Sequence, residues 1–423
     1  MTEKRLKVAV IGAGVAGITT AYLLDRKHEV TLYEKNDYVG GHTNTIVINR
    51  GPDEGTPVDT GFIVLNDRNY PTLNRFLVQL DVQIRKSDMS FSLYCEKSGL
   101  QYSSNFPDGF FAQRKNLWSV AFWKMVYDIL KFNKKARLDL QNKNLGNVPL
   151  GEYLNQGNFS KQMIENYIIP MGAAIWSARP QQMFEFPAST FIRFFENHGL
   201  LTLKDRPQWY SVIGGSHTYV KKFLKGFKGT VITNSNIDQI CRIETGIAVR
   251  MTDHTFKHFD CVIIATHTDE ALTLLSDPSN DEKRLLGAWT YEKNHAVLHT
   301  DPSVMPPNKH AWASWNYTRE KSSKDSNPVS VSYDMNRLQG LQTKNRYFVT
   351  LNRTKSIPSE HIIREINYTH PSYTFQSINT QKELPKLNGV QNTFFCGSYF
   401  GYGFHEDAVQ SGTAVARAFG IEL

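Results

Sequence analysis

The sequence has few cysteines and no long apolar run. Four cysteines occur among its 423 residues, at Cys95, Cys241, Cys261 and Cys396, and none forms a CxxC pair or stands at zinc-ligand spacing. This usage predicts reduced core thiols in a cytoplasmic protein, without a disulfide framework or a metal site. No stretch approaches about 18 consecutive apolar residues, so no transmembrane helix is expected. The apolar run after MTEKRLK is too short and too rich in glycine for a secretory signal, which again predicts a cytoplasmic location.

The composition also lacks the bias of disordered, repetitive or nucleic-acid-binding chains. Hydrophobic residues make up 40% and charged residues 21%, as in ordinary globular proteins. At roughly 100–200 residues per domain, the length suggests two or three domains. The net charge of +8 favours anionic partners such as phosphates or lipid headgroups. Because Lys and Arg are spread along the chain and no nucleic-acid module is visible, no nucleic-acid partner is expected.

The N-terminal segment has the pattern of a dinucleotide-binding βαβ unit. Residues 7–11 (KVAVI) form an apolar β-branched run, and a GxGxxG motif, a helical pattern and a second strand follow. We expect Gly12 to make the tight turn, Gly14 to let a pyrophosphate approach the backbone, and Gly17 to let the helix pack closely. Glu34 ends the second strand, where a carboxylate accepts both ribose hydroxyls. The free N–H groups at the start of the helix attract phosphates.

A glycine pair indicates which dinucleotide is bound. Gly40 and Gly41 come six residues after Glu34, an arrangement typical of the glutathione-reductase-like class that binds FAD. No second GxGxxG occurs, so a separate NAD(P)H domain is not expected. The predicted cofactor is therefore FAD.

The C-terminal segment contains a second strand, turn and helix. Residues 392–396 (NTFFC) indicate a buried strand, and Gly397 and Ser398 follow it. The helix after them has apolar residues at 3.6-residue spacing, with Glu406 and Asp407 in the first turn, where acidic side chains suit the helix dipole. An ordinary amphipathic terminal helix is the alternative interpretation of this segment.

Seven short sequence blocks, spread along the chain, resemble motifs of a known protein family. They are GGHTNT from Gly40, DTGFIVLN from Asp59, PMGAAIWS from Pro170, IGGSHTYV from Ile213, LHTDPSVMP from Leu298, AWASWNY from Ala311 and CGSYFGYGFHED from Cys396. As a set they resemble the flavin amine oxidase superfamily, which includes monoamine oxidases, phytoene-type desaturases and protoporphyrinogen oxidase. Within it, they resemble a bacterial subgroup of amine-oxidase-like proteins.

The resemblance implies an α/β fold with two domains. A Rossmann-like FAD-binding domain of the glutathione-reductase type would comprise residues 1–68, 205–272 and 388–423. An inserted α+β substrate domain would comprise residues 69–204, which are mostly helical, and 273–387. The latter segment has alternating stretches that predict an antiparallel sheet with one polar face, lying over the flavin.

The resemblance also implies which residues hold FAD. They contact the ADP half, the flavin ring or the ribitol, and they are Gly12, Ala13, Gly14, Val15, Ala16, Gly17, Glu34, Lys35, Gly40, Gly41, His42, Thr43, Thr60, Gly61, Phe62, Ile237, Gly397, Ser398, His405, Glu406 and Asp407. Ser398 stands where the superfamily usually has an acid, so a direct carboxylate–ribitol bond is not expected. No cysteine matches the position used for covalent flavin, so the FAD is expected to be non-covalent.

Aromatic and histidine residues are the candidates for catalysis. Phe404 matches a wall of the aromatic cage of amine oxidases, and a phenylalanine there suits an apolar substrate. Histidine is the side chain best suited to proton transfer near neutral pH, and we rank His405 first and His42 second. Any of these residues could instead be structural. The wider candidates are Trp176, Trp312, Trp315, Tyr317 and Tyr402, with His217, His299 and His370 as weaker ones.

Residues 111–138 form a basic aromatic segment with helical period. One stripe contains Trp118, Phe122, Met125, Ile129 and Phe132, and Lys and Arg cluster at both ends. A core-packing helix with solvated ends is one interpretation. A helix that rests on an anionic membrane, at the inner face, and admits a lipid is the other.

The leading hypothesis is an FAD-dependent oxidoreductase that desaturates an apolar substrate, such as the acyl chain of a fatty acid or phospholipid. The Phe404 position and the basic aromatic segment motivate it, together with the subgroup's association with lipid-modifying enzymes. The alternatives are an amine oxidase that releases peroxide and ammonia, a non-redox flavoenzyme such as a fatty-acid isomerase or hydratase, and a flavin-binding protein without catalysis. The expected partner is a small-molecule or lipid substrate, and the oligomeric state stays open.

Overall fold

A five-stranded parallel sheet, built from separate segments of the chain, lies on one side of the molecule. The structure, a computed structural model, describes residues 4–321, 324, 326–353 and 357–423. Within these the parallel strands lie in the order β10-β2-β1-β14-β20. Their bounds are β1 Lys7–Ile11, β2 Glu29–Tyr33, β10 Thr230–Ile232, β14 Cys261–Ile264 and β20 Thr393–Phe395. The continuous apolar runs at β1 and β14 are buried on both faces, as a covered parallel sheet requires.

Two helices from opposite ends of the chain pack together on this sheet. They are α1 (Val15–Leu24) and α14 (His405–Ala418). A Cβ added at Gly412 would meet the Ala16 carbonyl oxygen at 2.7 Å and the Thr20 hydroxyl at 2.8 Å. Gly412 therefore permits a close helix contact, which brings the predicted C-terminal half of the site beside the N-terminal half.

A seven-stranded sheet forms the centre of the molecule. Its order is β19-β15-β18-β17-β16-β7-β8, antiparallel except for the parallel pair β16 and β7. Its strands are β7 Phe91–Cys95, β8 Leu100–Ser103, β15 Tyr291–His299, β16 Trp315–Arg319, β17 Ser330–Asp334, β18 Phe348–Leu351 and β19 Ile362–Pro371. All come from the two segments predicted to be inserts. The division into two domains at the predicted boundaries stays a prediction.

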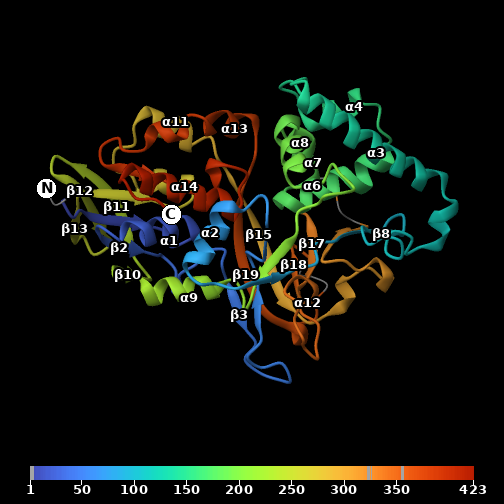
Figure 1. The fold of residues 1–423 in the computed structure, drawn as a ribbon, viewed down its shortest axis with the longest axis horizontal. Helices are drawn as coiled ribbons and strands as arrows, with labels where there is room; N and C mark the ends of the chain where they lie inside the picture. The colour runs from blue at the N-terminus through green and yellow to red at the C-terminus, as the bar shows by residue number, and fades with distance from the viewer. Residues whose placement is uncertain (1–3, 322–323, 325, 354–356) are drawn as a thin grey trace.

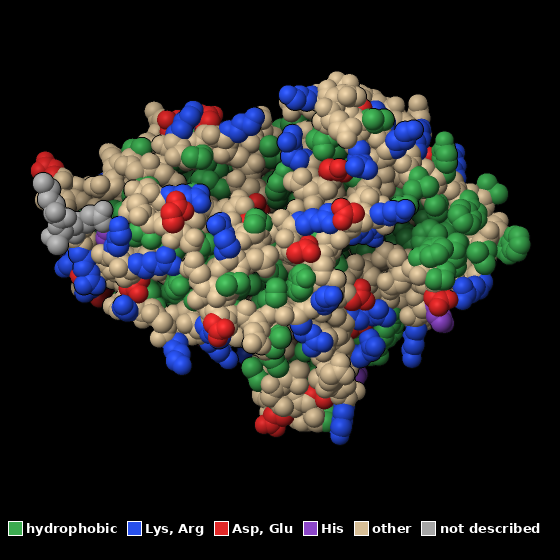
Figure 2. All heavy atoms as spheres, viewed as in Figure 1, with side chains coloured by type: hydrophobic (Ala, Val, Ile, Leu, Met, Phe, Trp, Pro, Cys, Tyr) green, Lys and Arg blue, Asp and Glu red, His purple; other side chains and the backbone are tan. Residues whose placement is uncertain are grey.

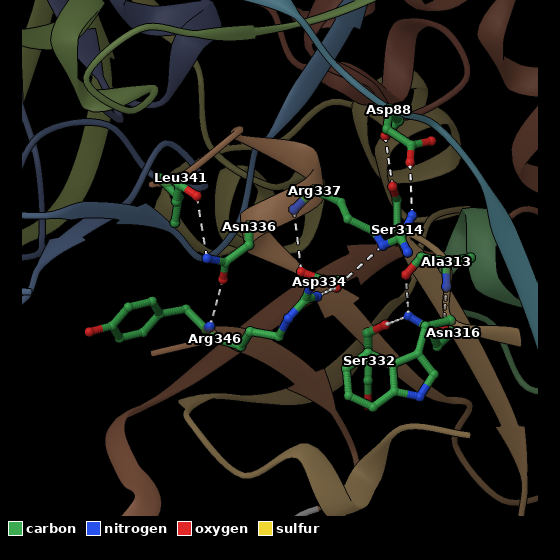
Figure 3. A network of polar contacts seen from close by, with 12 residues as sticks. Asp88, Ala313, Ser314, Asn316, Ser332, Asp334, Asn336, Arg337, Leu341 and Arg346 are labelled. Atoms are coloured by element: carbon green, nitrogen blue, oxygen red, sulfur yellow. Dashed lines mark hydrogen bonds and ion pairs between the residues drawn. The ribbon is translucent and has the colours of Figure 1, made fainter. Parts of the chain in front are cut away.

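The polar face of this sheet is buried beneath a network of polar contacts (Figure 3). Ser332 and Asp334 of β17 are almost fully inaccessible, and Asp334 forms ion pairs with Arg337 and Arg346. Burial raises the pKa of Asp334, and the two guanidinium groups oppose that rise. Arg337 also pairs with Asp88 at 3.2 Å. The polar side chains on this part of β17 are therefore buried, and two partly exposed arginines cover them.

Helices of the first insert form a group beside the central sheet (Figure 1). These helices, α3 to α8, occupy the right of the view, and the parallel sheet with both labelled chain ends occupies the left. The bounds are α3 Val120–Gln141, α4 Leu150–Gln156, α5 Lys161–Met163, α6 Ile169–Trp176, α7 Pro180–Glu185 and α8 Ala188–Asn197. A π-helical turn, Ile164–Ile168, joins α5 to α6.

The predicted helix over residues 111–138 is wrong at its start. A short 3-10 helix, Arg114–Trp118, comes first, and α3 begins at Val120 because the Ser119 hydroxyl accepts the Phe122 N–H as a cap. Phe122 is buried as predicted, but Trp118 lies outside the helical period and is 89% exposed.

The remaining elements connect these parts. They are α2 Pro71–Gln79, α9 His217–Gly226, α10 Thr268–Leu274, α11 Asn280–Leu286, α12 Met335–Leu338, α13 Phe375–Gln381, β3 Thr45–Val47, β4 Pro57–Asp59, β5 Val64–Asn66, β6 Ile84–Lys86, β9 Trp209–Val212, β11 Ile237–Ile243, β12 Gly246–Met251 and β13 Phe256–Phe259. Among the described residues, no helix has the length and apolar character needed to cross a bilayer.

Candidate functional site

One large cavity runs from the glycine-rich turn to the helices of the first insert. Its volume is about 1840 Å³, whereas pockets for drug-sized ligands measure roughly 300–1,000 Å³. It therefore has room for a dinucleotide and a second molecule. The predicted cofactor residues that line it are Gly12, Gly14, Val15, Ala16, Glu34, Lys35, Gly40, Gly41, His42, Thr60, Gly61, Phe62, Ile237, Gly397, Ser398 and His405. Ala13, Gly17, Thr43, Glu406 and Asp407 do not line it.

The turn after β1 is built for close approach of an anion. Gly12 has φ +98°, which favours glycine. A Cβ on Gly14 would meet nothing within 4 Å, so the cavity reaches the backbone there. Gly14 is the N-cap of α1 and no side chain caps the helix, so its first N–H groups are free of side-chain acceptors. These groups suit the phosphates of a dinucleotide.

Glu34 is fixed at the end of β2 by hydrogen bonds from the backbone. Its Oε2 accepts the Ala13 N–H at 2.9 Å, and its Oε1 accepts the N–H and the side-chain amide of Asn36. Ala13 therefore positions the carboxylate instead of lining the cavity. Each carboxylate oxygen has more than one lone-pair site, so Glu34 keeps acceptor capacity for a ribose.

Two further backbone segments close on the same turn. Gly40 and Gly41 both have positive φ, and a Cβ on Gly41 would lie 3.2 Å from Gly14 Cα. A Cβ on Gly61 would meet the His42 carbonyl oxygen at 2.2 Å. Glycine is needed at these positions because the chains lie too close for a side chain.

The first turn of α14 differs from the expected arrangement. The Glu406 carboxylate points to α2, where it accepts the N–H groups of Thr72 and Leu73 at 2.9 and 2.8 Å. Asp407 accepts the Phe404 N–H, and burial raises its pKa to about 6. Both side chains therefore serve as helix caps and do not line the cavity, and the place of this turn beside the flavin stays a prediction.

His405 lines the cavity in a closely packed position. Its ring stacks on Phe62 with centroids 3.7 Å apart, and its Nε2 lies 3.0 Å from the Thr43 hydroxyl. That hydroxyl also bonds the Tyr219 hydroxyl. Burial lowers the pKa of His405 to about 3. The imidazole is therefore neutral near pH 7, which favours a hydrogen-bonding role over that of a general acid.

His42 lies within a cluster of histidines that the sequence did not group together. Its ring is 5.3 Å from that of His370 and stacks on Tyr368 at 4.9 Å. Burial lowers the pKa of His42 well below 6.5, and nearby His370 and His267 lower it further. Its buried Nε2 has no hydrogen-bond partner within the part of the chain that the structure describes. His267 and His370 also line the cavity, although sequence reasoning omitted the first and ranked the second low.

The aromatic residues divide into two groups. Tyr402, Phe404 and Trp176 line the cavity and surround Phe194, whose ring stacks on Phe404 at 5.2 Å and lies 4.8 Å from Trp176. Trp315 lines another part of the wall. Sequence reasoning missed Phe194 because it lies on α8, which no recognised motif marks.

Four of the wider candidates do not line the cavity. They are Trp312, Tyr317, His217 and His299. Trp312 packs against Phe348, and His299 bonds the Thr350 hydroxyl within the central sheet. These positions support the structural interpretation for all four.

The end of the cavity away from the glycine-rich turn is largely apolar. Residues Val126, Ile129 and Leu130 of α3 line it, together with Met171 and Ile175 of α6. Phe91, Phe110 and Phe111 complete this region, which we call the apolar chamber. The chamber suits a hydrocarbon chain better than a polar substrate, because burial of apolar surface drives such binding.

The comparison with protein families and curated proteins gives a consistent picture. The model for flavin-containing amine oxidoreductases matches residues 15–352. An L-amino-acid oxidase of Siganus canaliculatus is 21% identical over 326 residues, which are 69% of this chain and 56% of that enzyme. A zeta-carotene desaturase of Solanum lycopersicum is 52% identical over 48 residues, 11% of this chain and 8% of that protein. The chain thus matches about half of the first relative's length and a short part of the second.

Solved structures share the fold along almost the whole chain. A fatty acid isomerase from P. acnes, described as producing CLA, has a TM-score of 0.70 at 14% identity and covers 99% of both chains. Putrescine oxidase bound to putrescine has a TM-score of 0.70 at 14% identity, covering 98% of this chain and 99% of its own. These likenesses confirm the predicted α/β class.

Proposed function

Because the chain belongs to the flavin-containing amine oxidoreductase family, we propose that it oxidises an apolar substrate, the acyl chain of a fatty acid or phospholipid. It is an FAD-dependent oxidoreductase by family, and the substrate class is the part proposed here. The observation that carries the proposal is the apolar chamber, which continues directly from the predicted flavin residues within one cavity.

The residues of the glycine-rich turn would hold the ADP half of FAD. The free N–H groups at Gly14 and the start of α1 would bind the phosphates, and Glu34 would bind the ribose. Ser235 and Ile237, which line the cavity beside Glu34, would contact the adenine. When bound, FAD supplies two-electron oxidation, and the protein supplies position and electrostatics.

The aromatic group would hold the reacting part of the substrate. Phe194, Tyr402 and Phe404 present ring surfaces without a charged group, and Trp176 lies against them. Such walls exclude water and position a C–H bond, while the chamber holds the rest of the chain. An ammonium substrate would gain cation–π contacts with the same rings, which is why amines are tested beside lipids.

Desaturation also needs a group that takes a proton. Removal of two hydrogens from adjacent carbons would need a two-electron acceptor, which bound FAD would supply, and a base on the protein for the proton. We assign the proton to His42, because it lines the cavity and its buried Nε2 has no partner among the described residues, so this nitrogen is left to accept a proton. His405 already bonds Thr43 and would position the ring of Phe62.

Anaerobic mixing of the purified flavoprotein with candidate substrates tests the proposal. We expect fatty acids or phospholipids dispersed in detergent to bleach the oxidised flavin absorbance, with an alkene as product by mass spectrometry. Primary amines of matched chain length are the control. Bleaching by amines alone, with peroxide release in air, would establish an amine oxidase instead. Conversion of lipid without any net electron transfer would establish an isomerase.

A further inference from the structure

The outer face of α3 carries a continuous apolar surface. Seven large apolar side chains between 106 and 130 are more than one third exposed, and those on the helix recur every three or four residues. The seven are Phe106, Leu117, Trp118, Val120, Trp123, Tyr127 and Leu130, which we call the α3 patch. Trp118 and Val120 are 89% and 84% exposed. Figure 2 shows hydrophobic side chains gathered on the side of the molecule where α3 and β8 lie.

Basic side chains surround the patch. Residues 106–141 contain seven Lys or Arg against three Asp. Asp128 is buried, Asp108 and Asp139 form ion pairs with Arg114 and Lys135, and Arg137 pairs with Glu196. Four lysines in this range have no ion pair among the described residues, so the free charge at this surface is positive. A groove on the same helix face is lined by Tyr127, Leu130, Lys131, Lys134, Lys135, Leu138 and Asp139. Apolar rings beside lysines match the chemistry of an anionic lipid surface.

The patch is also continuous with the mouth of the large cavity. Phe106, Trp123 and Leu130 are exposed at the surface and line the cavity at the same time. The inner neighbours Val126 and Ile129 belong to the apolar chamber. One helix, α3, therefore has a face toward solvent and a face toward the chamber.

We propose that the α3 patch docks on the surface of an anionic lipid bilayer and that an acyl chain passes from the bilayer into the chamber beside Phe106. The second clause rests on the proposed function, whereas the docking does not. A second copy of the chain is a poorer occupant, because a two-fold contact would place two positive surfaces against each other. Aromatic residues such as Trp118 and Trp123 suit the boundary between headgroups and acyl chains.

Flotation with vesicles tests the docking. The purified flavoprotein is mixed with vesicles of phosphatidylcholine, with or without phosphatidylglycerol, at low and high salt. We expect binding to the anionic vesicles at low salt, weakened by salt. The double variant Trp118→Glu/Val120→Glu removes two apolar side chains and adds two negative charges, so its binding should fall about tenfold or more.

Val78→Glu is the matched control, since Val78 is 75% exposed on α2 and lies outside the patch. It should bind vesicles like the unmodified protein. Both variants should keep the flavin spectrum and the activity on detergent-dispersed substrate, which separates docking from catalysis. Equal vesicle binding by the double variant and the control would overturn the proposal, as would no binding at low salt. Light scattering measures the oligomeric state. If the unmodified protein and the control are dimers and the double variant is a monomer, the patch binds a second copy of the chain and the bilayer proposal is overturned.

Discussion

His42 and His405 line the same cavity but have different surroundings. The Nε2 of His405 bonds Thr43, whereas the Nε2 of His42 has no partner in the described ranges. We therefore expect His42→Gln to retain FAD and to slow flavin reduction by about 100-fold, the lower range for loss of a general base. His405→Gln should slow it by less than about tenfold, since it removes a positioning contact. Anaerobic stopped-flow measurement of flavin absorbance compares them, and the reverse order of effects would contradict this assignment.

His299 offers a test of stability against pH. Its Nδ1 accepts the Asp301 N–H, its Nε2 bonds Thr350, and burial lowers its pKa from 6.5 to about 4. Between pH 4 and pH 6.5 this histidine binds more protons in the unfolded chain than in the folded one. The free energy of unfolding therefore falls as the pH drops from 6.5 toward 4. In His299→Gln the free energy of unfolding should fall less over this pH range than in the unmodified protein, by up to about 3 kcal/mol. Denaturant unfolding at a series of pH values measures the difference.

The exposed His310 is the control for that series. His310→Gln should leave the pH dependence of the unfolding free energy unchanged. A His299→Gln variant whose curve parallels that of the unmodified protein would refute the account of this buried imidazole.

Single residues were predictable where a local motif fixes them. Gly12, Gly14 and Glu34 lie within one βαβ unit, so spacing along the chain indicates their contacts. Phe194 and His267 reach the cavity through packing between distant segments, which periodicity does not reveal. The motif that contains Glu406 predicts a place beside the flavin, but it does not reveal that both carboxylate oxygens accept N–H groups from the buried start of α2.

At the scale of elements, α14 and α2 are joined through one carboxylate. Glu406 accepts two N–H groups in the first turn of α2, and both donors are buried. Glu406→Ala should therefore lower the free energy of unfolding by about 1–3 kcal/mol, since it leaves buried donors without an acceptor. Glu422→Ala removes an exposed ion pair with Arg417 and should cost less than about 1 kcal/mol. If denaturant unfolding gave the same loss of unfolding free energy for Glu406→Ala and Glu422→Ala, the Glu406 cap would not stabilise the fold.

The start of α3 shows a limit of periodicity. Residues 111–138 have a helical pattern throughout, but the hydroxyl of Ser119 caps a helix that begins only at Val120. Trp118 therefore leaves the buried stripe and becomes the most exposed large apolar side chain. Periodicity therefore predicts the buried side of α3, but it does not reveal the Ser119 cap that leaves Trp118 outside the helix.

At the scale of the whole molecule, the cavity is assembled from segments far apart in the sequence. The glycine-rich turn, the end of β20 and the start of α14 form one end, and α3, α6 and the central sheet form the other. The class of fold was predictable because each strand and motif has a local pattern. The shape of the chamber was not, because it depends on how the helices of residues 69–204 pack over the sheet.

Flavin content per chain tests the central claim most directly, namely that FAD lies against the bare backbone at Gly14. A Cβ there meets nothing within 4 Å, so Gly14→Val should fold normally and project into the cavity. Gly226→Val is the control, because its Cβ also meets nothing within 4 Å but Gly226 ends α9, outside the cavity. After denaturation and filtration, the unmodified protein and the control should release close to one FAD per chain, and Gly14→Val almost none. Equal FAD release from all three would contradict the account.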